Sequence, residues 1–213
     1  MCFSTLFFDL DDTLYPSNSG LWDAIRDRMN EFMYERVGLS RAEIPILRRF
    51  YFETYGTTLQ GLQIHYNVDA DEYLAYVHDL PLEQYIRPDP ELRLMLISLN
   101  RSKWIFTNAD DNHARRVLTV LGLNDCFTGI AEVRSLGFHS KPDVEAYRRA
   151  MSLAGETDPH QCVLFDDTPR NLAPGRDLGF FTVLVGSREP NSVAHFSISR
   201  LNDLPQAIPE LWA

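Results

Sequence analysis

The sequence predicts an α/β fold, in which a parallel sheet is covered by helices on both faces. Short apolar runs alternate with amphipathic helical patterns, and this alternation is typical of parallel sheets. Composition agrees, because 45% of the 213 residues are hydrophobic and 23% are charged, as in ordinary globular proteins. These values argue against a disordered, collagen-like or coiled-coil chain. One long block without a strand interrupts the alternation and predicts a second, helical region.

Four short runs are predicted to be buried strands, because they are apolar on both faces. They cover residues 5–8, 104–106, 162–165 and 181–185. Amphipathic helices are expected between them, because apolar residues recur at intervals of three and four. The three stripes are Leu92, Met95, Leu96 and Leu99; Ala114, Val117, Leu118 and Leu121; and Val144, Tyr147, Met151 and Ala154.

The block from residue 15 to residue 84 shows helical patterns only and is too long for a simple crossover. We therefore expect an all-helical cap at 15–84, inserted into a catalytic core formed by 1–14 and 85–213. Helices are predicted over about 41–55, from Thr57 onward, and over 71–78. The first cap helix is expected to bury a stripe of apolar residues: Trp22, Ile25, Met29, Phe32, Met33 and Val37.

Charge and apolar content limit the kinds of partner that the chain can bind. Thirty acidic and twenty basic side chains give a net charge of −10, which disfavours nucleic-acid polymers and anionic membranes. The first apolar run stops at Asp9, and no segment approaches the roughly 18–20 apolar residues of a membrane span. Three cysteines (Cys2, Cys126 and Cys162) do not form a disulfide framework. We expect a soluble cytoplasmic protein, monomeric or homodimeric. A small phosphorylated substrate stays open, because a site can be locally positive on an acidic protein.

Carboxylates follow two of the predicted strands. Asp9 and Asp11 stand at the carboxyl end of the first strand, and Asp166 and Asp167 end the strand that begins near Cys162. Open parallel sheets bind their ligands at this edge. Four carboxylates in one crevice repel one another unless a cation neutralises them. Because the ligands are oxygens only, we expect Mg²⁺ as cofactor.

A hydroxyl, an amide and an ammonium are predicted to join this cluster. Thr107 and Asn108 follow the strand at 104–106, and Lys141 precedes a predicted helix. Such groups facing a carboxylate–Mg²⁺ site can hold a tetrahedral anion. Asp9 is then a candidate nucleophile toward phosphorus.

These motifs resemble those of the haloacid dehalogenase-like hydrolases in order and spacing. The matching segments are Asp9-Leu10-Asp11-Asp12-Thr13, Thr107-Asn108, Lys141-Pro142 and Asp166-Asp167. Three further segments are similar to the pyrimidine 5′-nucleotidase subfamily: 11–16 (DDTLYP), 55–62 (YGTTLQGL) and 106–109 (FTNA), and the His113-Ala114-Arg115-Arg116 run fits it too. The resemblance implies a Rossmann-like core with a cap after the first strand, and catalysis through an aspartyl-phosphate.

The resemblance also implies a role for each motif residue. Asp9 is the nucleophile, and Asp11 is the acid that protonates the leaving oxygen and then the base that activates water. Thr107, the Asn108 backbone and Lys141 hold the phosphoryl oxygens. The implied metal set is Asp9, the Asp11 carbonyl and Asp167, with Asp166 bound through a water or in the surrounding shell. Thr13 and Asn171 support the site, and Asn171 orients Lys141 or the acidic pair.

The cap is expected to supply substrate specificity. Gly56 breaks the helical pattern, and Thr57 and Thr58 open the next helix with free N–H groups and hydroxyls. These residues are candidate substrate contacts, and Tyr15, just after the catalytic loop, is a candidate hinge or substrate contact. A plain helix–helix turn is an equally good interpretation of this break. The six histidines show no ligand spacing, so structural or surface roles are expected for them.

The leading hypothesis is a Mg²⁺-dependent phosphomonoesterase, with pyrimidine nucleoside 5′-monophosphates as expected substrates. Phosphatases of other small esters and phosphomutases share the same motifs, so they stay open as alternatives. A dehalogenase is disfavoured, because cleaving a carbon–halogen bond needs no second acid such as Asp11. The alternative outside enzymes is a phospho-acceptor or binding module, which would not need a helical lid.

Overall fold

The computed structural model describes residues 3–212, and Cys2 lies outside this range. The chain divides into two compact units. Unit 1 comprises Met1–Ser19 and Ile86–Ala213, and unit 2 comprises Gly20–Tyr85. The predicted catalytic motifs fall in unit 1, and unit 2 covers most of the range predicted to be a cap. That unit 2 acts as a cap stays a prediction.

A six-stranded parallel sheet forms the centre of unit 1 within the described residues, in the order β3-β2-β1-β4-β5-β6. The first strand is therefore central, and its Phe8 pairs with Ile105 on one side and Phe165 on the other. The predicted α/β class is confirmed. The strands are β1 (Thr5–Phe8), β2 (Ser102–Phe106), β3 (Gly129–Ala131), β4 (Cys162–Asp166), β5 (Phe181–Val185) and β6 (Phe196–Ile198).

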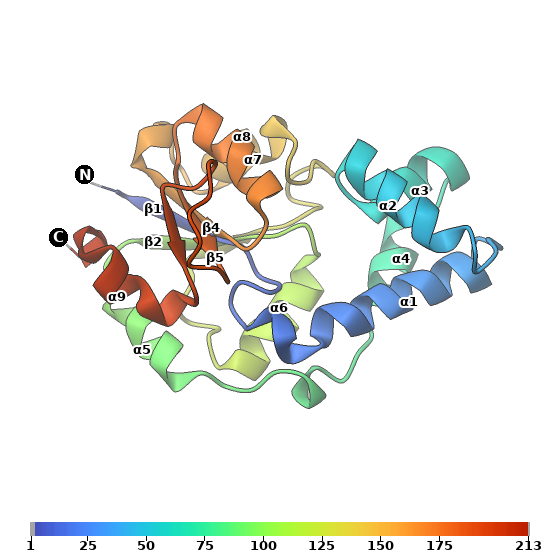
Figure 1. The fold of residues 1–213 in the computed structure, drawn as a ribbon, viewed down its shortest axis with the longest axis horizontal. Helices are drawn as coiled ribbons and strands as arrows, with labels where there is room; N and C mark the ends of the chain where they lie inside the picture. The colour runs from blue at the N-terminus through green and yellow to red at the C-terminus, as the bar shows by residue number, and fades with distance from the viewer. Residues whose placement is uncertain (1–2, 213) are drawn as a thin grey trace. The chain divides into compact units, whose positions relative to one another are not determined.

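Helices cover both faces of this sheet, as Figure 1 shows: α7 and α8 lie over one face, and α5, α6 and α9 over the other. The α-helices of unit 1 are α5 (Pro90–Ser98), α6 (Asp111–Leu121), α7 (Val144–Leu153), α8 (Pro169–Leu178) and α9 (Leu204–Ala207). Its 3₁₀ segments are Ser17–Ser19, Pro159–Gln161, Leu201–Asp203 and Pro209–Trp212. Aromatic rings fill the space between sheet and helices. Phe7 of β1 is fully buried, with its ring centroid 6.1 Å from that of Phe106 and 5.9 Å from that of Phe180. This packing fixes the strand ends that carry the motifs.

Two strands, β3 and β6, are absent from the sequence prediction. Each is three residues long and lies at an edge of the sheet. Edge strands need no continuous apolar run, since one side of each has no neighbouring strand. Each is a strand because it pairs with a neighbour: β3 with β2, and β6 with β5.

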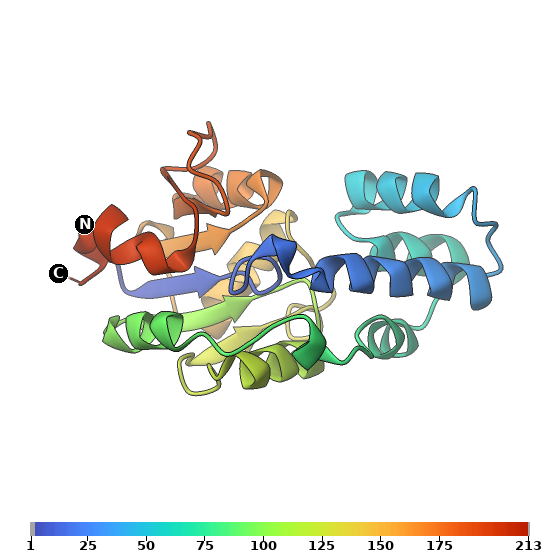
Figure 2. The same ribbon diagram turned by 60° about the horizontal axis from the view of Figure 1, so that its bottom comes forward.

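Residues 20–85, all of which are described, contain four α-helices and one 3₁₀ segment (Figure 2). Helix α2 packs against α3, and α1 packs against α4. The helices are α1 (Leu21–Glu35), α2 (Ile44–Tyr55), α3 (Thr58–Tyr66) and α4 (Ala70–Val77), and the 3₁₀ segment is Leu82–Gln84. Gly61 permits the close approach of α3 to α2, because a Cβ there would overlap the Tyr51 ring.

The predicted buried stripe of the first helix in unit 2 is partly wrong. Leu21 is buried, whereas Trp22 is 40% exposed. Met29 is only half-buried, and Val37 lies beyond the helix, which ends at Glu35. The apolar stripe of α1 therefore starts one residue earlier than Trp22 and contains Ile25, Phe32 and Met33.

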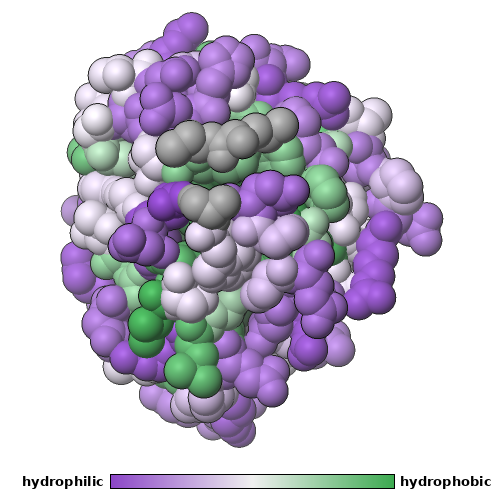
Figure 3. Space-filling model, turned by 90° about the vertical axis from the view of Figure 1, so that its left-hand side faces the viewer, coloured by the Kyte–Doolittle hydropathy of each residue, from purple (hydrophilic) through white to green (hydrophobic). Residues whose placement is uncertain are grey.

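None of the described helices combines the length and the apolar character needed to cross a lipid bilayer. The face shown in Figure 3 is coloured mostly as hydrophilic, with small separate apolar areas. Scattered apolar residues of this kind are normal for a protein surface. Cys126 and Cys162 are buried free thiols.

Candidate active site

Three carboxylates meet at the carboxyl end of the central strands. Asp9 follows β1, Asp166 ends β4, and Asp167 follows it. Because β1 and β4 are adjacent and parallel, both strands end at the same edge of the sheet. One oxygen from each of the three carboxylates lies within 4.8 Å of the others. The sequence placed these residues together, and the topology of the sheet explains why.

Lys141 reaches into this cluster from the loop before α7. Its Nζ lies 2.7 Å from Asp9 Oδ1 and 2.7 Å from Asp166 Oδ2. The side chain is 1% exposed, and Nζ lies 5.0 Å from the centre of the Phe106 ring. A buried ammonium needs such partners, since an unpaired charge in the interior is strongly destabilising.

The charges of this cluster shift the pKa values of its members. Burial raises the pKa of Asp9 well above its usual range. Attraction to Lys141 lowers this pKa, and repulsion from Asp166 and Asp167 offsets part of that lowering. Burial and the nearby Asp166 raise the pKa of Asp167 to about 7. Burial alone would lower the pKa of Lys141, but attraction to Asp166 and Asp9 raises it above its usual value. Three carboxyl groups are therefore more than one ammonium can keep ionised in this space.

The donor set fits a divalent cation. Fully ionised, the three carboxylates and one ammonium would sum to a charge of −2 in a buried space, which a divalent cation would neutralise, and the available ligands are oxygens, which Mg²⁺ prefers. Asp166 is the member most fully engaged by the protein. Its Oδ1 accepts from the Thr168 N–H at 2.9 Å, and Asn171 Nδ2 lies 3.1 and 3.2 Å from its two oxygens. Asp9 and Asp167 are therefore the better candidates for direct ligands.

Thr13 connects the two acidic loops through one hydroxyl group. Its Oγ1 donates to Asp9 Oδ2 at 3.2 Å and accepts from the Asp167 N–H at 3.1 Å. The Asp9 N–H donates to the Phe165 carbonyl at 2.8 Å, which extends the pairing of β1 and β4. These bonds fix the positions of the loops that carry Asp9 and Asp167 relative to each other.

Thr107 and Asn108 lie at the end of β2, beside β1. Thr107 is buried, and its Oγ1 accepts from the Ala109 N–H at 3.0 Å. The Asn108 side chain forms two hydrogen bonds with the backbone of Lys141: Oδ1 accepts from its N–H at 2.8 Å, and Nδ2 donates to its carbonyl at 3.0 Å. This clamp was not predicted from the sequence. It fixes the loop from which Lys141 reaches the carboxylates.

Asp11 lies in the turn after β1 and contacts two side chains that the sequence did not connect with it. The Tyr15 hydroxyl donates to Asp11 Oδ1 at 2.6 Å, and His113 Nε2 lies 2.9 Å from the same oxygen. A structural or surface role was expected for His113, and the structure places it fully buried against a motif carboxylate. Its place on the apolar face of α6, four residues before Val117, is the signal that marks it as buried.

Of the residues predicted to contact substrate, Gly56, Thr57 and Thr58 lie in unit 2, whereas Tyr15 lies in unit 1. Gly56 ends α2 with a φ of 93°, and Thr57 caps α3 by accepting the Gln60 N–H at 3.2 Å. Thr58 is the first residue of α3 and is buried. A specificity role for these three residues stays a prediction, as do the catalytic, phosphate-binding and metal-binding roles of the motif residues in unit 1.

Comparison with known protein families shows to which family this chain belongs. Residues 3–179 match the haloacid dehalogenase-like hydrolases. The chain belongs to this family. The family-level resemblance of the motifs is thereby confirmed, and the closer placement among pyrimidine 5′-nucleotidases stays a prediction.

Curated relatives of this haloacid dehalogenase-like hydrolase include two named proteins of phosphate chemistry. Phosphate metabolism protein 8 from Saccharomyces cerevisiae is 29% identical over 192 residues, which are 84% of this chain and 60% of that protein. The chain thus spans less than two thirds of that relative. Pyrophosphatase PpaX from Listeria welshimeri is 23% identical over 207 residues, 94% of each chain.

Several solved structures share the fold of this chain. The HAD hydrolase YfnB from Bacillus subtilis, bound to magnesium, has a TM-score of 0.65 at 17% identity, over 97% of this chain and 98% of that one. β-Phosphoglucomutase from Clostridium difficile also gives 0.65, at 19% identity over 99% and 97% of the chains. L-2-Haloacid dehalogenase from Xanthobacter autotrophicus gives 0.60, at 14% identity over 96% and 97%. One architecture therefore serves several reactions, and the site residues must distinguish them.

Proposed function

We propose that this hydrolase is a Mg²⁺-dependent phosphomonoesterase that works through a phosphorylated Asp9. The observation that carries the proposal is the position of Lys141 Nζ, 2.7 Å from both Asp9 and Asp166 in a buried cluster with Asp167. A nucleophilic carboxylate beside a fixed cation is suited to attack on an anionic phosphate ester. The magnesium in the YfnB structure and the phosphate chemistry in the names of the curated relatives support the same assignment.

Each step uses a group of this chain. A carboxylate oxygen of Asp9 forms a bond to phosphorus while the bond from phosphorus to the leaving oxygen breaks, and Asp11 gives that oxygen its proton. Asp11 then takes a proton from a water molecule, whose oxygen attacks phosphorus and releases inorganic phosphate from Asp9. Lys141, Thr107 and the Asn108 backbone hold the phosphoryl oxygens through both steps.

Asp9, the Asp11 carbonyl and Asp167 would hold the cation, with Asp166 supporting them. Bound there, Mg²⁺ would offset the repulsion between the Asp9 carboxylate and the phosphate ester. The hydrogen bonds that Asp166 accepts from Lys141, Thr168 and Asn171 agree with a supporting role for this residue.

For the substrate class, we propose nucleoside 5′-monophosphates, with pyrimidine bases preferred. The support is the similarity of 11–16, 55–62 and 106–109 to the pyrimidine 5′-nucleotidases. The segment at 55–62 contains Gly56, Thr57 and Thr58 at the turn between α2 and α3, and this turn would select the leaving group.

Release of inorganic phosphate from a panel of esters tests the proposal. UMP, CMP, AMP, GMP and small sugar phosphates are supplied with Mg²⁺, and each reaction is repeated with EDTA. We expect sustained release that EDTA abolishes and that is fastest with UMP or CMP. Isomerisation of a sugar phosphate without sustained release would instead identify a phosphomutase.

Asp9→Asn is the decisive variant for the chemistry. It replaces one carboxylate oxygen by an amide nitrogen and so removes the nucleophile. Turnover should fall below detection while the fold is kept. Retained phosphatase activity in this variant would overturn the nucleophile assignment. Phosphorylation of wild-type Asp9 without turnover would identify a phospho-acceptor module.

A further inference from the structure

Two side chains from separate parts of unit 1 converge on one oxygen of Asp11. Tyr15 lies four residues further along the turn, and His113 lies on α6, 102 residues away in the sequence. We propose that Tyr15 and His113 are positioning residues, which hold Asp11 Oδ1 so that Oδ2 is the oxygen that exchanges the proton with the leaving group. This inference rests on the proposed function, in which Asp11 is the acid and base.

Tyr15 supplies the first anchor. Its hydroxyl donates to Asp11 Oδ1 at 2.6 Å, and the residue is 4% exposed. Burial, and then the nearby Asp11 carboxylate, raise the pKa of Tyr15 above its usual value, so the phenol keeps its proton. A short bond from a buried donor restricts rotation of the carboxyl group about its last side-chain torsion.

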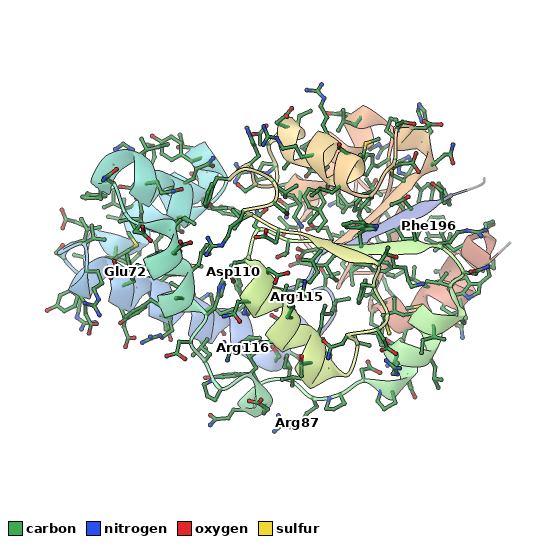
Figure 4. All side chains as sticks on the ribbon, turned by 180° about the vertical axis from the view of Figure 1, so that it is seen from behind. Glu72, Arg87, Asp110, Arg115, Arg116 and Phe196 are labelled. Atoms are coloured by element: carbon green, nitrogen blue, oxygen red, sulfur yellow. The ribbon has the colours of Figure 1, made fainter. Side chains whose placement is uncertain are left out.

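His113 supplies the second anchor from a rigid position. Its side chain is 1% exposed, and Nε2 lies 2.9 Å from Asp11 Oδ1. Asp110, labelled at the start of α6 in Figure 4, caps the helix, because its Oδ1 accepts the His113 N–H at 3.1 Å. Buried Ala114, Val117 and Leu118 continue the face on which His113 lies. The imidazole is therefore held by the helix start and by the core packing of α6.

The two contacts determine how protons are arranged on Asp11. Tyr15 already donates to Oδ1, so the imidazole tautomer that matches this oxygen carries its hydrogen on Nε2 and donates as well. Oδ1 then accepts two hydrogen bonds, and the proton of the carboxylic acid resides on Oδ2. That proton passes to the leaving oxygen as the ester bond breaks, and Oδ2 later takes one from water. Both donors also stabilise the carboxylate that the first transfer leaves behind.

The test compares two leaving groups, because only a strongly basic alkoxide needs a proton as it departs. Tyr15→Phe, His113→Leu and His113→Gln are assayed with a nucleoside monophosphate and with p-nitrophenyl phosphate. With the alkyl ester, we expect Tyr15→Phe and His113→Leu to lower kcat/KM about 10- to 100-fold, which is part of the roughly 10²- to 10⁴-fold contribution of a general acid. With the aryl ester, the loss in kcat/KM should stay below about threefold, because this ratio covers the steps up to departure of the leaving group and excludes the later attack of water, in which Asp11 acts as base for both esters. His113→Gln keeps an N–H near the Nε2 position and should recover most of the activity.

Matched controls separate positioning from a general loss of structure. Tyr76→Phe removes a hydroxyl that donates to Glu35 at 2.9 Å in unit 2, and His160→Gln alters an exposed histidine. Both should keep wild-type kinetics with both esters. In an Asp11→Asn background, Tyr15→Phe and His113→Leu should have no additional effect, because the group that they position is gone. Equal losses in kcat/KM on the two esters, or additive losses in the Asp11→Asn background, would overturn the inference.

A readout that does not need turnover keeps this inference distinct from the proposed function. Long-range ¹H–¹⁵N spectra distinguish the two imidazole tautomers, and we expect the Nε2–H form for His113 in the wild type. The His113 signal should shift in Asp11→Ala and stay unchanged in His160→Gln. A wild type that hydrolyses neither ester, with the expected His113 spectrum, would refute the proposed function alone. Active wild type whose His113 carries its hydrogen on Nδ1 would refute the inference alone.

Discussion

The two units of the chain differ in where their polar groups lie. In unit 1, charged side chains are buried at the ends of adjacent strands, where Lys141 contacts Asp9 and Asp166. In unit 2, ion pairs lie at the surface, as in Arg49 and Glu53, which are 81% and 58% exposed. Its interior is formed mainly by apolar and aromatic packing, such as Phe32 against Tyr73. Unit 1 therefore bears the cost of burying charge, which is typical of a catalytic site.

This difference teaches which changes each unit tolerates. Charge removal in unit 1 leaves buried carboxylates without a counter-charge, whereas in unit 2 water replaces the lost partner. Unit 2 depends instead on close helix packing, so its sensitive positions are small residues at contacts. Gly61, which lies against the Tyr51 ring, is such a position.

Lys141→Met should have the largest effect. The change keeps an unbranched side chain but removes the charge between Asp9 and Asp166, so we expect a loss of about 3–5 kcal/mol in unfolding free energy. Phosphate release should fall about 100- to 1,000-fold, as when a donor to a reacting oxyanion is removed. Urea unfolding in EDTA and the phosphate assay measure the two effects. Arg49→Met, which breaks an exposed pair in unit 2, should change neither, and equal stability of the two variants would contradict the comparison.

Gly61→Ala should have an intermediate effect that is confined to unit 2. The new methyl group overlaps the Tyr51 ring, and overpacking of this kind costs about 1–3 kcal/mol. Hydrogen exchange followed by mass spectrometry should show faster exchange in residues 20–85 and little change in 86–212. Gln63→Ala, in the same helix, serves as the control and should leave exchange unaltered. Equally fast exchange in both segments would show that the two units unfold together.

His195 should give the smallest effect, and it tests titration away from the carboxylate cluster. Its Nδ1 accepts from the Thr182 N–H at 3.0 Å, so the bond needs an unprotonated Nδ1. Burial, and then Arg176, lower the pKa of His195. Below the unfolded value of about 6.5, the unfolded chain binds a proton that the folded chain resists, so stability falls as pH falls. His195→Asn should reduce this fall between pH 7 and 5 in urea titrations, and an unchanged slope would argue against it.

The sequence was most informative where chemistry and topology coincide. The motif carboxylates stand at the ends of apolar runs that became adjacent strands, so strand order alone brings Asp9 and Asp166 together. The buried face of the first helix in unit 2 was harder to predict. Leu21 and Trp22 are both apolar neighbours, so a stripe that starts at either residue fits the sequence, but only Leu21 is buried. Contacts between distant segments, such as His113 with Asp11 or Asn108 with Lys141, depend on side-chain directions that spacing does not encode.

The hydroxyl of Thr13 has a consequence for the order in which this enzyme matures during synthesis. Its partner Asp167 lies 154 residues further along the chain, and β1 pairs with β4 on that same side. While the chain has not yet been made as far as β4, one edge of β1 has no partner strand. Asp166 is also missing, so Lys141 lacks the second of its two carboxylate partners. A chain cut short before β4 would therefore expose one edge of β1 and would lack the carboxylates of Asp166 and Asp167 beside Asp9.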